Sequence, residues 1–262
     1  MLPIYAIFFL ILGLVVGSFL NVVISRFNTN RTLGGRSACM SCQTKLNWYE
    51  LIPLFSFVTL RGRCRSCSSK ISLIYPIVEL VTGLMFLGLY MKLRDTLFLN
   101  PGVFILNYAY YASAFSILIV IAFYDIRHKI IPDRLALVLG VMSFIGLFFW
   151  DESGFYIHVP SLFEVLSGLF IALPFAFFWL ISKGLWMGLG DAKLALSLGW
   201  LIGLSRVLPA AILAFWSGAL LGIMLILFSR HHGLKSEIPF APFLVFGAIM
   251  AFIFDLHIFP FF

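Results

Sequence analysis

The stretch GLGDAK, from Gly188 to Lys193, begins a hydrophobic segment that is too short to cross a bilayer without it. Only 12 uncharged residues follow, from Leu194 to Ser205, which is about 18 Å of helix against a hydrocarbon core about 30 Å thick. The helix must therefore include this stretch, and the carboxylate of Asp191 then lies at the membrane boundary. An ionised group at that depth is costly and is a functional candidate.

The composition is that of a membrane protein. Hydrophobic residues make up 62% of the 262 residues, charged residues 11%, and the mean hydropathy is +1.06, so a soluble fold would have too few polar side chains for its surface. The sequence predicts an all-α polytopic membrane protein with about eight transmembrane helices. The spans are 1–25, 71–91, 96–124, 135–150, 165–182, 188–205, 207–229 and 238–254.

The basic residues predict the orientation of these helices. Of 18 Lys and Arg residues, 15 fall in the first, third, fifth and seventh connections when Lys193 of the GLGDAK stretch is counted with the fifth. The positive-inside rule assigns these connections to the cytoplasm, with both termini outside. The first helix lacks the features of a cleaved signal peptide and is expected to remain as an anchor. The net charge of +7 indicates this topology and attraction to anionic headgroups; nucleic-acid binding is not expected.

The only substantial soluble part follows the first helix. We divide the chain into that helix (1–25), a cytoplasmic segment (26–75) and a bundle of about seven helices (76–262). The 50 residues of the cytoplasmic segment are too few for a self-sufficient core, and domains of this size commonly need a metal or disulfides.

All four cysteines of the chain lie in this segment, as two C-x-x-C pairs with 21 residues between them: Cys39, Cys42, Cys64 and Cys67. This spacing predicts a four-thiolate zinc site, and a shell closed by four thiolates makes the metal structural. A redox pair or unligated structural cysteines are the alternatives. Disulfides are disfavoured because cytoplasmic thiols stay reduced.

A second aspartate lies at the membrane boundary. Asp125 ends the third predicted span, and at the C-terminus of a helix the macrodipole disfavours an anion. Nothing in the construction of that helix explains it. Asp191, near a helix N-terminus, is also explained by capping, and Asp133 by the start of the fourth span.

Asp125 and Asp191 are both predicted on the cytoplasmic side, where two helix ends of a compact bundle can approach one another. Two adjacent carboxylates do not ionise together, so one holds a proton while the other acts as a base. Such a pair can activate water for attack on a peptide carbonyl. Gly188 and Gly190 would let an extended substrate backbone come close.

With these residues in place, the sequence resembles the type IV prepilin peptidases, the bifunctional leader peptidase/N-methyltransferases among the GxGD intramembrane aspartyl proteases. The resemblance covers nearly the whole chain and includes the two cysteine pairs. The matching stretches, in the family's order, are GSFLNVV (17–23), NWYELIP (47–53), LRGRC (60–64), YPIVEL (75–80), DIR (125–127), IPD (131–133), GLGDAK (188–193) and IPFAPF (238–243).

The resemblance implies a protease of the bacterial inner membrane that cuts basic leaders from type IV prepilins and type II secretion pseudopilins at the cytoplasmic face. Asp125 and Asp191 match the catalytic pair, and Cys39, Cys42, Cys64 and Cys67 match the zinc ligands.

The resemblance also implies a second activity, N-methylation of the new N-terminal residue with S-adenosylmethionine. Gly62 matches a family position linked to methylation. Glu79 is a candidate participant, and pairing with a nearby Arg or Lys is its simpler explanation. The sequence has no glycine fingerprint for a nucleotide, so this activity is inferred from the resemblance alone.

Two other functions compete with this reading. Intramembrane charges also occur in transporters, although a transporter would place them nearer the midplane and show repeated halves. A zinc-stapled membrane scaffold without protease activity is the other alternative, and it leaves Asp125 unexplained.

Overall fold

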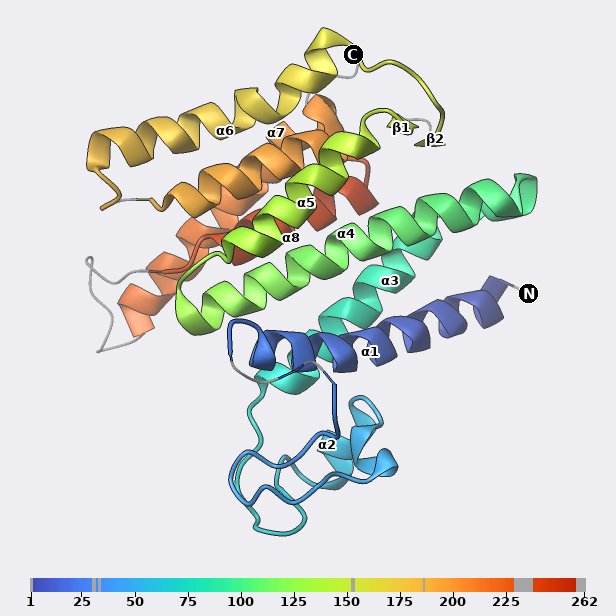
Figure 1. The fold of residues 1–262 in the computed structure, drawn as a ribbon, viewed down its shortest axis with the longest axis vertical. Helices are drawn as coiled ribbons and strands as arrows, with labels where there is room; N and C mark the ends of the chain where they lie inside the picture. Colours follow the sequence, from blue (N-terminus) through green and yellow to red (C-terminus); the bar gives the residue numbers. More distant parts are fainter. Residues whose placement is uncertain are drawn as a thin grey trace. The chain divides into compact units, whose positions relative to one another are not determined.

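The computed structural model describes residues 2–29, 32, 34–151, 154–185, 187–228 and 238–257, and these are predominantly helical (Figure 1). The long helices are α1 (Leu2–Arg26), α3 (Ile74–Leu99), α4 (Pro101–His128), α5 (Asp133–Gly146), α6 (Leu162–Ser182), α7 (Leu189–Phe228) and α8 (Ala241–Ile253). The shorter elements are the 3-10 helix η1 (Trp48–Leu51), helix α2 (Phe55–Thr59) and an antiparallel pair, β1 (Trp150–Asp151) and β2 (Gly154–Phe155). The predicted all-α fold class is confirmed.

Among the described residues, five helices are long and apolar enough to cross a membrane: α1 from Pro3 onward, α3, α4, α6 and α7. Helix α7 begins at Leu189, so the helix includes the GLGDAK stretch from its second residue onward, as the short apolar segment required. It covers two predicted spans, joined across Gly203, where the backbone leaves the helical conformation (φ 79°, ψ 164°). The exact number of spans stays a prediction, and residues 229–237, which carry part of the charge used for orientation, lie outside the described residues.

The chain forms two compact units, Met1–Arg94 and Asp95–Phe262. In the first unit, α1 and α3 pack closely through glycines. A Cβ on Gly13 would lie 2.8 Å from the Cα of Gly83, and one on Gly17 would lie 2.8 Å from the Cα of Glu79. Small residues four apart are typical of close contacts between membrane helices. The Asn21 side-chain amide donates to the Tyr75 carbonyl at 3.0 Å, so the end of α1 is tied to the start of α3.

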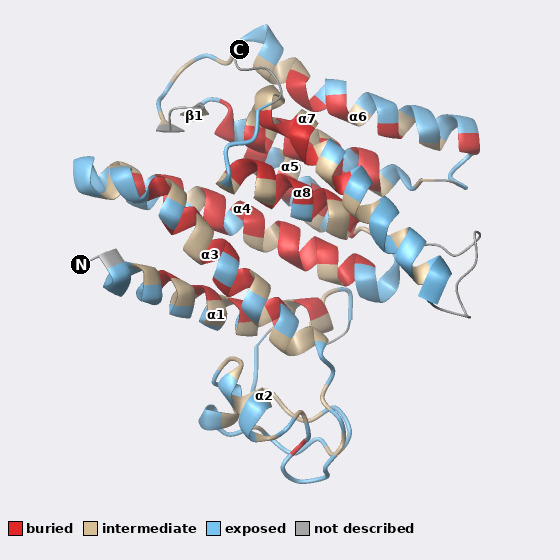
Figure 2. Cartoon of the chain, turned by 180° about the vertical axis from the view of Figure 1, so that it is seen from behind, coloured by how far each residue is buried: buried red, intermediate tan, exposed pale blue. Residues whose placement is uncertain are grey.

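The second unit contains α4 to α8 and a continuous apolar core. Its buried residues gather on α4, α8 and the first half of α7 (Figure 2). Phe115, Leu118 and Ile121 of α4 are fully buried. Glycines let α6 and α7 approach, since a Cβ on Gly199 would lie 2.5 Å from the Cα of Gly168. This packing fixes the C-terminal end of α4 and the N-terminal end of α7.

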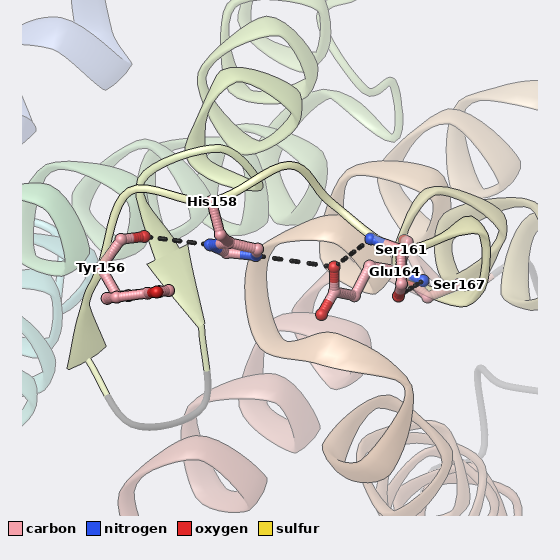
Figure 3. Close-up of polar contacts among 5 residues, drawn as sticks. All are labelled: Tyr156, His158, Ser161, Glu164 and Ser167. Carbon is pink, nitrogen blue, oxygen red and sulfur yellow. Dashed lines mark hydrogen bonds and ion pairs between the residues drawn. The ribbon is translucent and has the colours of Figure 1, made fainter.

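The entry to α6 is built from polar contacts (Figure 3). Ser161 and Glu164 form a capping box, in which the Ser161 hydroxyl accepts the Glu164 N–H at 3.3 Å and the Glu164 carboxylate accepts the Ser161 N–H at 2.7 Å. His158 Nε2 lies 3.6 Å from the same carboxylate. The Ser167 hydroxyl donates to a carbonyl oxygen of α7 at 3.0 Å. These contacts therefore begin the helix and hold it against α7.

Candidate active site and metal centre

Asp125 lies in the last turn of α4 and is 5% exposed. The helix ends because Lys129 adopts the left-handed conformation (φ 55°) and its N–H donates to the Asp125 carbonyl at 2.7 Å. That cap uses the backbone alone. The Asp125 carboxylate instead accepts the N–H of Ala241, the buried first residue of α8. The termination of α4 therefore does not account for the aspartate side chain.

Asp191 lies in the first turn of α7 and is 9% exposed. Its carboxylate accepts the N–H of Gly188, so the capping explanation describes a contact that exists. Capping does not account for its burial, nor for its position near Asp125, with which its charge interacts. The fold brings together these two aspartates, which are 66 residues apart in the sequence.

The connection between α4 and α5 lies against the start of α7. A Cβ on Gly190 would lie 2.9 Å from the Cβ of Ile131, so Gly190 is needed for packing between these two segments. A Cβ on Gly188 would meet nothing closer than 3.7 Å, so packing does not require glycine at this position. Asp133 is more than a helix start, because it pairs with Lys193 of α7 at 2.6 Å.

The candidate metal centre lies in the first unit. The Sγ atoms of the four cysteines all lie within 4.8 Å of one another, with Cys39 and Cys67 3.8 Å apart and Cys42 and Cys64 3.9 Å apart. A tetrahedron with Zn–S bonds of about 2.3 Å has sulfur atoms about 3.8 Å apart. The four thiols therefore fit a zinc ion, whereas a disulfide needs about 2.05 Å.

The two cysteine pairs form the same turn twice. In each, the N–H of the first cysteine donates to a carbonyl five residues later, at 3.0 Å for Cys39 and 2.8 Å for Cys64. In each, the residue after the second cysteine has a positive φ, 56° at Gln43 and 57° at Ser68. We call these turns the first and second knuckle. Their likeness shows that the ligands are arranged by two copies of one local backbone pattern.

Backbone N–H groups favour the thiolate of Cys39. Those of Cys42 and Ser41 lower the pKa of the Cys39 thiol to about 6. In the second knuckle, the Ser69 hydroxyl lowers the pKa of Cys67. Thiolates are the form that binds a metal, so the local structure prepares these two ligands.

Gly62 lies two residues before the second knuckle, with a φ of 65°. A Cβ at this position would lie 2.9 Å from the ring of Phe57 in α2. The Gly62 N–H donates to the Phe57 carbonyl at 2.9 Å, and the Gly62 carbonyl accepts the Ile71 N–H at 2.8 Å. A side chain at this position would therefore crowd the turn.

Comparison with known proteins finds two families. The Bacterial Peptidase A24 N-terminal domain matches residues 11–93, and the Type IV leader peptidase family matches residues 112–223. The chain is 32% identical over 271 residues to the prepilin leader peptidase/N-methyltransferase of Aeromonas hydrophila, which covers 91% of this chain and 87% of that protein. The chain belongs to the type IV leader peptidase family.

Other members of the type IV leader peptidase family are similar over most of this chain. Proteins of the same name from Myxococcus xanthus and Bacillus subtilis are 34% and 30% identical, over 90% and 96% of the chain and 67% and 95% of those proteins. No solved structure matches. The N-terminal match contains the four cysteines and nearly coincides with the first compact unit, whereas the second match contains Asp125 and Asp191.

Three contacts at these sites were not anticipated from the sequence. Lys193 and Asp133 each stand in a quoted motif, but nothing in the sequence pairs them. Ala241 stands in the IPFAPF stretch, yet it acts through a backbone N–H that a side-chain pattern does not reveal. The third is a hydrogen bond between Glu79 and the backbone of Leu54, at 2.9 Å.

Proposed function

We propose that this chain removes the leader peptide from type IV prepilins and type II secretion pseudopilins and then N-methylates the new N-terminal residue. The observation that carries the proposal is the pair of buried aspartates at the ends of α4 and α7, in a chain whose curated relatives are named prepilin leader peptidase/N-methyltransferase. The enzyme is therefore an aspartic endopeptidase and a methyltransferase.

Cleavage follows from the two carboxylates. One of Asp125 and Asp191 holds a proton and the other is ionised, because two adjacent buried carboxylates do not carry two charges. The ionised carboxylate takes a proton from water as the water attacks the peptide carbonyl, and the protonated one polarises that carbonyl. The tetrahedral intermediate then loses its C–N bond as the carboxyl that took the proton from water gives it to the leaving amine. The N–H groups of Ala241 and Gly188 hold the two side chains in position.

Zinc, held by the four cysteines, has a structural role in this proposal. Between residues 27 and 77, Cys64 is the only described residue that is buried, so this segment has no apolar core of its own. A metal bound by both knuckles would join the two halves of the segment. Four thiolate ligands leave no position for a substrate, so the metal takes no direct part in cleavage.

For methylation, S-adenosylmethionine supplies an electrophilic methyl group to the free α-amine of the cleaved product. The described residues include a polar hollow beside the second knuckle, with Lys45, Asn47, Glu50 and Arg65 in its wall. Carboxylate and amide groups suit the hydroxyl and amino groups of such a donor. We assign Asn47 and Glu50 to hold it, and Gly62 to shape the adjoining turn.

The five apolar helices and the prepilin peptidase relatives support a multi-pass protein of the bacterial inner membrane. We propose that the cysteine segment and the aspartates face the cytoplasm, where the excess of Lys and Arg residues between 26 and 70 would contact anionic headgroups. A transporter or an inactive scaffold explains neither the paired aspartates nor the relatives.

The test is incubation of the purified protein with a prepilin and S-adenosylmethionine, followed by mass spectrometry of the product's N-terminus. The proposal predicts loss of the leader and a gain of one methyl group on the new N-terminal residue. An intact prepilin after complete incubation would contradict the protease assignment, and a cleaved but unmethylated product would contradict the methyltransferase assignment.

A further inference from the structure

A strained turn lies in the first unit, just before α2. Leu54 has φ 59° and ψ −46°, and the Phe55 N–H donates to the Pro53 carbonyl across it at 2.6 Å. These values describe a γ-turn of the rare form with a positive φ, which is unfavourable for a residue with a branched side chain. Such a turn persists only where surrounding contacts hold it.

The contact that holds this turn comes from α3. The half-buried Glu79 carboxylate accepts the Leu54 N–H at 2.9 Å and also the Ser18 hydroxyl of α1. The simpler explanation offered for Glu79, pairing with Arg or Lys, does not describe these two contacts. The backbone of Glu79 is held in place, because its Cα lies at the close contact between α1 and α3 that Gly17 allows. We call the hydrogen bonds of Glu79 to Leu54 and Ser18 the carboxylate clasp.

The turn is joined to Gly62 through one short helix. Leu54 directly precedes α2, and the Leu54 carbonyl accepts the Val58 N–H at 3.1 Å in its first turn. The ring of Phe57 in α2 covers Gly62, and the backbone carbonyl of Phe57 accepts the Gly62 N–H. The direction in which α2 leaves the γ-turn therefore sets the position of the Gly62 turn and of Cys64, two residues beyond it.

We propose that Glu79 is a positioning residue for methyl transfer: its clasp fixes the strained turn at Leu54 and, through α2 and Phe57, the Gly62 turn beside the zinc ligands. The inference rests on the proposed methyltransferase activity and on the part assigned to Gly62. It does not involve the two aspartates, which belong to the second unit.

Two substitutions of Glu79 separate positioning from a direct role of the charge. Glu79→Gln keeps an oxygen that accepts the Leu54 N–H but removes the negative charge, whereas Glu79→Ala removes both. If Glu79 acts through the turn, the glutamine variant keeps methylation within about threefold of wild type and the alanine variant loses it at least about tenfold. A carboxylate that binds the substrate amine or takes its proton would lose activity equally in both variants.

The experiment measures kcat and KM for methylation of a pre-cleaved pilin peptide, cleavage of a prepilin, and bound zinc for wild type, Glu79→Gln, Glu79→Ala and Ser18→Ala. We expect the alanine variant to lose methylation while zinc is retained and cleavage changes less than about twofold, with Ser18→Ala between wild type and Glu79→Ala. Equal loss in the glutamine and alanine variants, or parallel loss of cleavage, would overturn the proposal.

A second measurement does not depend on methyl transfer. Hydrogen exchange of a peptide covering residues 51–62 includes the Leu54 and Gly62 amides. We expect faster exchange in Glu79→Ala than in Glu79→Gln, with unchanged exchange in α8. If wild type lacks methylation but this difference appears, the proposed function fails and the clasp stands; if exchange is the same in both variants, the clasp fails. If the Glu79→Ala variant does not insert into the membrane, Ser18→Ala replaces it, and we expect its exchange in this peptide to be faster than that of wild type.

Discussion

The segment that holds the four cysteines (26–75) and the helices that hold the two aspartates (α4 to α8) are stabilised by different interactions. Between residues 27 and 77 only Cys64 is buried among the described residues, and the segment is organised by backbone turns and four thiols. The aspartates instead lie in the last turn of α4 and the first turn of α7, two helices that are anchored in an apolar core, with Phe115 and Leu194 fully buried. In one region a metal ion would do what side-chain packing does in the other. We therefore expect damage to one region to leave the chemistry of the other largely intact.

The largest effect is expected from the aspartates. Asp125→Asn and Asp191→Asn should each lower leader cleavage by about a thousandfold or more, because a single carboxylate lacks its titratable partner. The measurement is prepilin cleavage at equal amounts of inserted enzyme. Asp133→Asn is the matched control, since Asp133 lies nearby, at the start of α5, but outside the pair. Near wild-type cleavage by either variant would remove that residue from the catalytic pair.

Loss of one zinc ligand should affect methylation much more than cleavage. Cys64→Ser removes the buried ligand, so the metal should dissociate and residues 26–75 should become sensitive to protease. We expect methylation to fall at least about tenfold and cleavage by less than about threefold. Bound zinc, protease digestion and both activities are measured, with the exposed Ser41→Ala as control. Freshly purified wild-type protein that contains no bound zinc would contradict the structural role assigned to the metal.

A smaller effect within the same segment is expected at Gly62. Valine at a φ of 65° costs about 1–3 kcal/mol of strain and crowds Phe57, whereas asparagine tolerates this conformation. Gly62→Val should therefore lower methylation more than Gly62→Asn does, and both variants should keep zinc and most cleavage. Mass spectrometry of mature pilin gives both activities. Equal loss of cleavage and methylation with zinc retained would refute the division of labour.

The smallest effect is expected from the Lys193–Asp133 pair. Its side chains are 46% and 76% exposed, and an exposed ion pair contributes about 0–1 kcal/mol. Lys193→Met should slow cleavage by no more than about fivefold, since Ile131 and Gly190 still pack together. A variant with Asp at 193 and Lys at 133 should regain part of the loss. If the variant with the exchanged pair cleaves more slowly than Lys193→Met, the effect of Lys193 does not come from its pairing with Asp133.

The sequence predicted the helical class and the cluster of four cysteines because both depend on local patterns, whereas the catalytic roles of Asp125 and Asp191 stay a prediction. The short apolar segment after Lys193 required a helix that includes GLGDAK, and α7 does begin at Leu189. The spacing of the four cysteines predicted a cluster that the structure contains. The joined helix α7 was not predicted, because the sequence was divided at Arg206 whereas the backbone bends at Gly203.

What the sequence did not predict depends on long-range contacts of the backbone. The γ-turn at Leu54 is held by a carboxylate 25 residues away, and leucine itself gives no signal for a positive φ. The predicted spans are divided at Arg206, which is buried and pairs with Asp255 at 2.9 Å. A charge that finds a partner in the fold does not have to end a helix.

The most direct test of whether methylation is independent of the aspartate pair uses the Asp191→Asn variant. This variant is incubated with a pre-cleaved pilin and S-adenosylmethionine. The substrate no longer needs the aspartate pair, so the account predicts methylation close to the wild-type rate by an enzyme that cannot cleave a prepilin. Mass spectrometry of the pilin N-terminus reads the result. If the variant retains zinc and still fails to methylate the pre-cleaved pilin, the two chemistries are not separable and the central claim is wrong.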